Sequence, residues 1–176
     1  FGFTSFSFSA ERIVLDVAGL LFSSAIQHAD SYAVGDYTPA LQDVRRQLIY
    51  LNNTLRWDMV VVFDGGDSPW KRHERARRDS SHSSATAPAD SIRNQPIYIA
   101  LAAKICRDSF IYYGIAPEEA DPQCTFALSV RGVDFVPTLV VTGDSDLVGY
   151  GNTKVMIVSF VEDDDAVEWI IREDAE

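Results

Sequence analysis

Short, continuous apolar runs alternate along this chain with longer segments whose apolar residues recur at helical spacing. The first two runs, Arg12 to Val17 and Met59 to Phe63, are rich in β-branched residues and predict buried strands. An apolar helix is expected from about Ala18 to Ala29. The next helix carries start signals, because Thr38 suits an N-cap, Pro39 suits the first helical position, and leucine and valine then recur at helical spacing.

The second half of the chain continues this alternation after a basic helix that opens at Ser68. The segment from Asp79 to Asp90 is rich in serine and alanine, has little to bury, and predicts a mobile loop. The further expected elements are a helix from about Arg93 to Arg107, a helix that begins at Glu118 to Asp121, and strands at Phe110 to Tyr113, Thr138 to Thr142 and Lys154 to Phe160.

Strands that alternate with helices indicate an α/β fold in three layers. Because the strands are continuously apolar, the central sheet is expected to be mainly parallel and covered by helices on both faces. The length of 176 residues and the hydrophobic content of 47% suit a single globular domain. We place this domain at residues 1–161 and treat residues 162–176 as an acidic C-terminal segment.

Signals for a membrane, a disulfide framework or zinc are absent from the sequence. No apolar run approaches the length that spans a bilayer, and Phe1 to Phe8 lacks the basic start and long apolar core of a signal peptide. The sequence therefore predicts a soluble, intracellular protein without a membrane partner. Cys106 and Cys124 lie in helix-like segments without CxxC spacing, which predicts buried, inert thiols.

The formal charge of -11 is unevenly distributed, and its distribution says more than its sum. Residues 162–176 carry eight acids and one base, Arg172. By contrast, five cations fall within residues 71–78 beside a single acid, and they are Lys71, Arg72, Arg75, Arg77 and Arg78. Such a cluster predicts a surface that contacts phosphates, although a solvated helix face would have the same composition.

Carboxylates stand at the ends of four strand-like runs or in the turns after them. They are Asp16 after Ile13 to Leu15, Asp64 after Val60 to Phe63, the group Glu118, Glu119 and Asp121, and the pair Asp144 and Asp146 after Val140 to Gly143. The carboxyl ends of parallel strands converge on one crevice, and hard divalent cations take oxygen ligands. One Asp after a strand often only starts a turn or caps a helix, but four such segments favour a magnesium-dependent phosphoryl-transfer site.

These motifs resemble those of the flap endonuclease and XPG nuclease family, whose PIN-like domain is a parallel sheet with an acidic two-metal centre. The resemblance covers roughly residues 11 to 160. In family order, it rests on a strand that ends in Asp16, a Val-Phe-Asp-Gly strand at 62–65, an Ala-Pro-x-Glu-Ala-Asp element at 116–121 and Thr-x-Asp-x-Asp at 142–146. The family's further metal-binding Asp and its duplex-gripping helices have no assigned counterpart in this chain.

The resemblance implies roles for individual residues. The implied metal ligands are Asp16, Asp64, Glu119, Asp121, Asp144 and Asp146. Lys71 and Arg78 correspond to the family's cations that reach the scissile phosphate, and their spacing of seven residues puts both on one helical face. Phe22 corresponds to an aromatic on which the family stacks a base, although plain core packing would explain it equally well. The segment at about 67–95 corresponds to the family's helical arch.

The implied activity is Mg²⁺-dependent phosphodiester hydrolysis of DNA at 5′ flaps, junctions or 5′ ends, with two Mg²⁺ or Mn²⁺ ions as cofactor. The products would be a 5′-phosphate and a 3′-hydroxyl, and RNA is the alternative nucleic-acid partner. Lys71, Arg78, Asp64 and Glu119 would be catalytic, and Phe22, Arg72, Arg75 and Arg77 would bind the substrate. Such an enzyme would be nuclear if it serves eukaryotic DNA repair.

Two other functions remain open at this point. One is a nuclease-derived PIN-like scaffold that binds RNA or proteins without cutting, because a fold alone does not fix a function. Loss of ligands would be its signature, and all six are present. The other is a magnesium phosphohydrolase that acts on small molecules, which would have no use for a basic helix or an arch.

Overall fold

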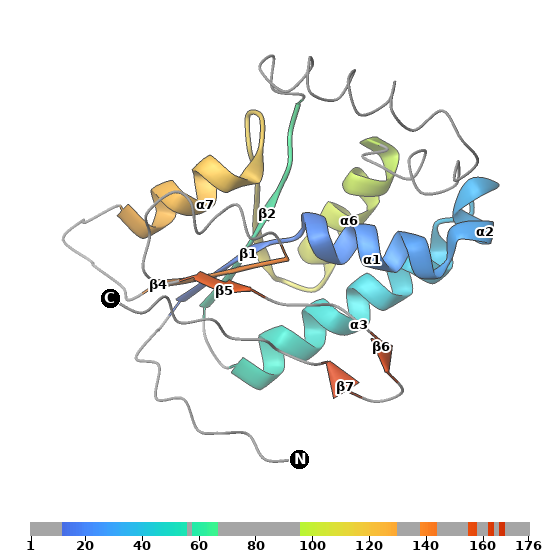
Figure 1. The fold of residues 1–176 in the computed structure, drawn as a ribbon, viewed down its shortest axis with the longest axis horizontal. Coiled ribbons are helices and arrows are strands. Elements are labelled where there is room, and N and C mark those ends of the chain that lie inside the picture. Colours follow the sequence, from blue (N-terminus) through green and yellow to red (C-terminus); the bar gives the residue numbers. More distant parts are fainter. Residues whose placement is uncertain are drawn as a thin grey trace.

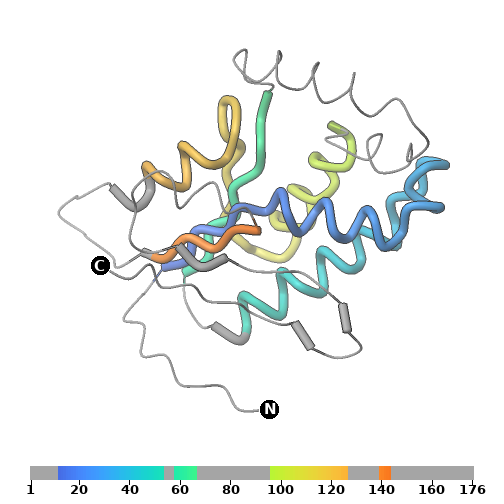
Figure 2. The backbone as a smooth tube through the Cα atoms, in the orientation of Figure 1, coloured from blue at the N-terminus to red at the C-terminus, as the bar shows by residue number. Residues whose placement is uncertain are grey.

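The computed structural model describes residues 12–55, 58–66, 96–129, 138–143, 155–157, 162–163 and 166–167 (Figure 1). Figure 2 shows the path of the backbone in the same orientation. The elements are β1 (Arg12–Asp16), α1 (Ala18–Gln27), α2 (Ala29–Ala33), α3 (Thr38–Leu55), β2 (Asp58–Phe63), α6 (Pro96–Asp108), β3 (Tyr112–Ile115), α7 (Ala120–Ser129), β4 (Thr138–Thr142), β5 (Val155–Ile157), β6 (Glu162–Asp163) and β7 (Ala166–Val167). The basic helix, the loop from Asp79 to Asp90 and the arch at 67–95 lie outside the described residues.

Five parallel strands form the central sheet in the order β3-β2-β1-β4-β5 (Figure 1). β1 lies at the centre, where Ile13 is level with Met59 of β2 and Leu139 of β4. A central strand of this kind is covered on both faces, which explains why β1 is apolar from Ile13 to Leu15 instead of alternating. The mainly parallel sheet expected from the sequence is confirmed.

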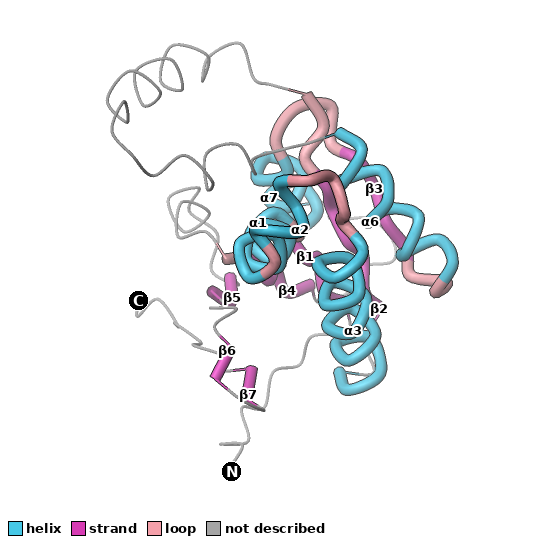
Figure 3. Tube along the Cα trace, turned by 90° about the vertical axis from the view of Figure 1, so that its right-hand side faces the viewer, coloured by secondary structure: helices cyan, strands magenta, loops and turns pink. Residues whose placement is uncertain are grey.

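Helices cover both faces of this sheet. On one face, α1, α3 and α6 enclose the larger core, whose fully buried side chains include Phe63, Leu15, Leu20 and Leu48. Figure 3 shows α3 and α6 running beside each other on this face. On the opposite face, α7 covers a smaller core that consists of Val14, Val62, Ala116, Ala120, Cys124 and Val140. The three-layer arrangement is therefore confirmed, and α7 alone among the described helices covers the second face.

Two helix boundaries in the first half differ from the sequence-based expectation. The helix expected from Ala18 to Ala29 is divided into α1 and α2, because His28 between them has a φ of -115° and a ψ of 34°. Thr38 is the first residue of α3 and not its N-cap. The carboxylate of Asp36 accepts the Thr38 backbone N–H at 3.0 Å, and hydrogen bonding to Thr38 lowers the pKa of Asp36. The first backbone amide of α3 thus finds its acceptor in a side chain two residues before it.

The second half also shows two departures. The strand expected at Phe110 to Tyr113 starts only at Tyr112, because Phe110 has a left-handed φ of 56° and the Ile111 N–H donates to the Cys106 carbonyl at 2.9 Å. Both residues therefore belong to the turn that ends α6. β6 and β7 form a small antiparallel pair inside the acidic segment, where no strand was predicted. No described helix has the length and apolar character to cross a membrane.

Candidate metal centre

The carboxyl ends of β1, β2, β3 and β4 lie at one edge of the sheet (Figure 1), because these strands run in the same direction. Asp16 is the last residue of β1, and Asp64 directly follows β2. Glu119 and Asp121 follow β3, at the start of α7. The remaining two predicted ligands, Asp144 and Asp146, lie outside the described residues.

Asp16 is the most enclosed of these carboxylates, with 3% of its surface exposed. Its Oδ1 accepts the Ala18 backbone N–H at 3.1 Å, where α1 begins. Its Oδ2 accepts the hydroxyl of the fully buried Thr142, at the end of β4, at 2.8 Å. A buried carboxylate needs such donors, because removing it from water without replacement costs on the order of several kcal/mol. The two bonds also hold the carboxylate between β1 and β4.

Asp64 is directed at the start of α7. Its Oδ1 accepts the Ala120 backbone N–H at 2.8 Å, which is one of the amides that a helix leaves without an internal acceptor. Its Oδ2 accepts no hydrogen bond from the residues that the structure describes. The bond to Oδ1 therefore fixes the direction of the Asp64 carboxylate relative to α7.

The turn after β2 and the turn after β3 are joined by backbone hydrogen bonds. These run from the Gly65 N–H to the Glu118 carbonyl at 2.6 Å, from the Gly66 N–H to the Pro117 carbonyl at 3.3 Å, and from the Ala116 N–H to the Phe63 carbonyl at 2.8 Å. The last of the three continues the pairing of the two strands beyond their ends. Asp64 and the acidic group at 118–121 therefore belong to one hydrogen-bonded unit.

Cys124 of α7 lies among the carboxylates. Its thiol pKa is raised, first by burial and then by the charges of Asp16, Asp121 and Asp64. These three carboxylates come from β1, from α7 and from the turn after β2, yet all are close enough to Cys124 to act on it electrostatically. Both cysteines are buried, as the sequence predicted. The only sequence signal for the location of Cys124 was its position three residues after Asp121, on the same helical face.

The acidic group at 118–121 divides by exposure. Glu118 is exposed, whereas Glu119 and Asp121 are partly buried. Within the described ranges, no three His, Cys, Asp or Glu side chains are arranged so that they could hold a metal ion. The donors present are carboxylate oxygens, which fit a hard divalent cation, and a complete site would need further ligands such as Asp144 and Asp146.

The predicted substrate-binding residues are only partly described. Phe22 lies on α1, is 36% exposed and belongs to neither buried core cluster, so full burial in the core is not its role. Lys71, Arg72, Arg75, Arg77 and Arg78 lie outside the described residues, so their contact with phosphate stays a prediction.

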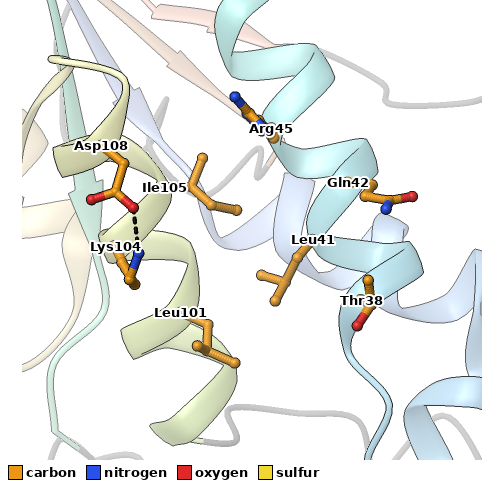
Figure 4. Close-up of a pocket in the computed structure, with 8 residues that line it drawn as sticks. All are labelled: Thr38, Leu41, Gln42, Arg45, Leu101, Lys104, Ile105 and Asp108. Atoms are coloured by element: carbon orange, nitrogen blue, oxygen red, sulfur yellow. Dashed lines mark hydrogen bonds and ion pairs between the residues drawn. The ribbon is translucent and has the colours of Figure 1, made fainter.

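A separate groove of about 230 Å³ lies between α3 and α6 (Figure 4). It is lined by Thr38, Leu41, Gln42, Arg45, Leu101, Lys104, Ile105 and Asp108. Lys104 and Asp108 form an ion pair there, and the hydrogen bond from Lys104 is the main reason that the pKa of Asp108 is lowered. None of the candidate metal ligands lines the groove, so it is not part of the candidate centre.

No protein-family model and no curated protein matches this chain, but solved structures do. The catalytic core of Rad2 in complex with a DNA substrate matches with a TM-score of 0.60 and 21% identity, over 94% of this chain and 47% of that one. The bacteriophage T5 5′-exonuclease with bound zinc matches with a TM-score of 0.61 and 17% identity, over 84% and 54%. A bacteriophage T5 D15 flap endonuclease complex with DNA and metal ions matches with a TM-score of 0.59 and 17% identity, over 85% of this chain and 54% of that one.

At these sequence identities, the similarity to the solved structures shows the fold of this chain. The chain has the PIN-like fold of the Rad2 and T5 flap endonuclease catalytic cores, as the order of its motifs predicted. It spans about half the length of those structures.

Proposed function

We propose that this chain is the catalytic part of a metal-dependent 5′ nuclease that hydrolyses phosphodiesters in DNA. The observation that carries the proposal is the placement of Asp16, Asp64 and the acidic group at 118–121 at the carboxyl ends of three parallel strands, where Asp64 is hydrogen-bonded to the start of α7. This edge is where open α/β sheets bind ligands. Carboxylates from three separate segments repel one another there unless a cation is shared. Solved structures of the same fold include a complex with DNA and metal ions.

The candidate ligands would hold two Mg²⁺ or Mn²⁺ ions, and they are Asp16, Asp64, Glu119, Asp121, Asp144 and Asp146. Bound ions of this kind activate water and stabilise charge on a leaving oxygen. The chain itself holds two of these carboxylates in a fixed direction. The Thr142 hydroxyl and the Ala18 amide hold Asp16, and the Ala120 amide holds Asp64. Such outer contacts tune metal affinity as well as orientation.

The basic segment at 71–78 would bind the substrate backbone. Lys71 and Arg78 would neutralise charge that develops on the scissile phosphate, a contribution of about 3 kcal/mol for one well-placed group. Arg72, Arg75 and Arg77 would contact neighbouring phosphates, which positions the nucleic acid without reading its sequence. Phe22, exposed on α1, would stack on a base near the scissile nucleotide.

The proposed substrate is DNA with a 5′ flap, a junction or a free 5′ end, and the products carry a 5′-phosphate and a 3′-hydroxyl. RNA is the alternative substrate. Within a eukaryotic cell, this activity belongs to DNA repair in the nucleus.

The test compares labelled 5′-flap DNA, unbranched duplex and single strand, each incubated with the purified protein and Mg²⁺, Mn²⁺ or a chelator. We expect metal-dependent cutting near the branch or the 5′ end and none with the chelator. Asp64→Asn should abolish the cutting. Asp58→Asn is the matched control, because Asp58 starts the same strand at the opposite edge of the sheet, where its carboxylate forms an exposed ion pair with Arg12.

Nucleic-acid binding without metal-dependent cutting would contradict the nuclease proposal and favour the PIN-like scaffold. Faster hydrolysis of small phosphate esters than of nucleic acid would favour the small-molecule phosphohydrolase.

A further inference from the structure

Gly65 lies where the turn after β2 touches the turn after β3. A Cβ atom at Gly65 would lie 1.8 Å from the Ala116 carbonyl oxygen and 2.9 Å from the Ala116 carbonyl carbon. Both are backbone atoms at a strand end, which cannot rotate aside as a flexible side chain can. The φ of Gly65 lies outside the left-handed region, so the requirement for glycine is one of space and not of backbone conformation.

The neighbouring glycine differs in this respect. A Cβ atom at Gly66 would lie 3.6 Å from the Pro117 carbonyl oxygen, which is an ordinary van der Waals contact. Gly66 also donates a longer hydrogen bond, at 3.3 Å, than the 2.6 Å bond from Gly65. The close approach of the two turns therefore depends on Gly65.

This approach connects two groups of candidate ligands. On one side, Gly65 directly follows Asp64, and β2 is paired with the strand that ends in Asp16. On the other side, the Gly65 N–H is bonded to the Glu118 carbonyl, directly before Glu119. The bond from the Ala120 amide to Asp64 crosses the same junction. A side chain at 65 would force the turns apart, because a Cβ atom 1.8 Å from a carbonyl oxygen is far inside the 3.0 Å below which something must shift. Misplacement by about 1 Å is costly in a site of fixed geometry.

We infer that Gly65 is a positioning residue of the candidate metal centre. Because Gly65 has no side chain, the turn after β2 and the turn after β3 can be joined by hydrogen bonds before any cation binds. The candidate ligand after β2 and those at the start of α7 are then held at a fixed separation. This inference rests on the proposed function, since it concerns the same ligands.

A purely structural role would have a different consequence. If Gly65 only served packing, its replacement would lower the free energy of unfolding and leave the metal affinity of the folded molecules unchanged. Metal affinity, measured on protein that is shown to be folded, separates the two roles.

The experiment compares the parent protein, Gly65→Ala and Gly66→Ala after removal of bound metal. Circular dichroism establishes that each is folded, and Mn²⁺ binding is measured by the paramagnetic resonance signal of the free ion. We expect Gly65→Ala to bind Mn²⁺ about tenfold or more weakly than the parent, the size of effect seen when outer contacts of a metal site are lost. Gly66→Ala should bind as the parent does.

Amide hydrogen exchange of the metal-free parent gives a second measurement that needs no variant. The Gly65 and Ala120 amides should be protected, because both are donors in the junction. If Gly65→Ala does not fold, the exchange measurement still tests whether the two turns are joined without metal, and fast exchange at Gly65 overturns the inference. Equal Mn²⁺ affinity of the parent and a folded Gly65→Ala also overturns it while leaving the proposed function intact. A parent that binds no Mn²⁺ overturns both.

Discussion

The hydroxyl of Thr142 donates a hydrogen bond to Oδ2 of Asp16 at 2.8 Å, across the junction between β4 and β1. Both residues are buried, and both lie at the last position of their strand. The bond therefore does two things at once. It replaces water around a buried carboxylate, and it fixes the direction of that carboxylate at the edge where the other candidate ligands lie.

Replacement of Thr142 by valine should destabilise the protein and weaken metal binding. Valine has nearly the same shape but no donor, so Asp16 loses one of its hydrogen bonds in a buried place, at a cost of about 1–3 kcal/mol in unfolding free energy. Chemical denaturation measures this cost, and Mn²⁺ titration measures the affinity. Thr142→Ser is the control, because it keeps the hydroxyl. Equal stability and affinity of the valine and serine variants would show that the hydroxyl is unimportant.

A second prediction concerns divalent metal. Carboxylates that are gathered at one sheet edge repel one another until a cation binds, so Mg²⁺ or Mn²⁺ should raise the melting temperature of a metal-free sample. The double variant Asp144→Asn, Asp146→Asn should lose this rise. Asp43→Asn should keep the rise in melting temperature, because Asp43 lies on α3 and pairs with His28 and Arg46, which are not candidate ligands. Absence of any metal-dependent shift in the unmodified protein would count against the site.

Much of the fold could be predicted from the sequence because the signals are local. The strand expected at Thr138 to Thr142 has these bounds in the structure, since four of its five residues are β-branched and such short runs favour a strand. The parallel arrangement could be predicted because the strands are continuously apolar and do not alternate between apolar and polar residues. The placement of Asp16, Asp64 and the acidic group at 118–121 at one edge then followed from the fold class, because β1, β2 and β3 run in the same direction.

The contacts that hold the candidate centre together could not be predicted. The Thr142 bond to Asp16 joins residues 126 positions apart, and its partner depends on which strands pair. The position of Cys124 among carboxylates depends on how α7 crosses the sheet. The steric requirement at Gly65 arises from another turn that reaches it only in the folded chain. Such contacts are tertiary, and a local pattern carries no information on them.

The thiols give a prediction on pH. Burial raises the pKa of Cys106 to about 11 from an ordinary value of 9.0, and burial together with nearby carboxylates raises that of Cys124. Native protein at about pH 8 should therefore react with a thiol reagent far more slowly than denatured protein. Because the folded pKa of Cys106 is the higher one, its contribution to stability is present below 9.0 and is lost as the pH rises through about 11.

Denaturant titrations on either side of this pH range measure the loss of stability. Rapid labelling of Cys124 in the native protein at about pH 8 would show instead that the thiol is accessible and that α7 does not stay closed over the sheet.

Lys71 and Arg78 are expected to act on the phosphate backbone, so their effects should not depend on base sequence. Lys71→Ala and Arg78→Ala should lower cleavage of every substrate sequence by a similar factor, and binding by the parent should weaken steeply with salt. Cleavage rates on a panel of flap sequences test this. Arg45→Ala is a suitable control, because Arg45 is an exposed arginine that lines the separate groove on α3. Variants that cut as fast as the parent would exclude both residues from the mechanism.

The last prediction concerns the segment from Asp79 to Asp90, which lies outside the described residues. Its serine, alanine and proline content provides almost no apolar surface to offset the entropy of ordering, so contact with nucleic acid is the interaction expected to order it. If it forms part of an arch, a single-stranded 5′ end must pass through before the branch reaches the carboxylates. A bulky protein bound to that 5′ end should then slow the cutting of a flap, whereas the same protein on the 3′ end should not. Single-turnover cleavage of free, 5′-blocked and 3′-blocked flaps measures this difference. Equal rates on all three, with an active enzyme, would rule out threading and favour a more open ribonuclease of the PIN type.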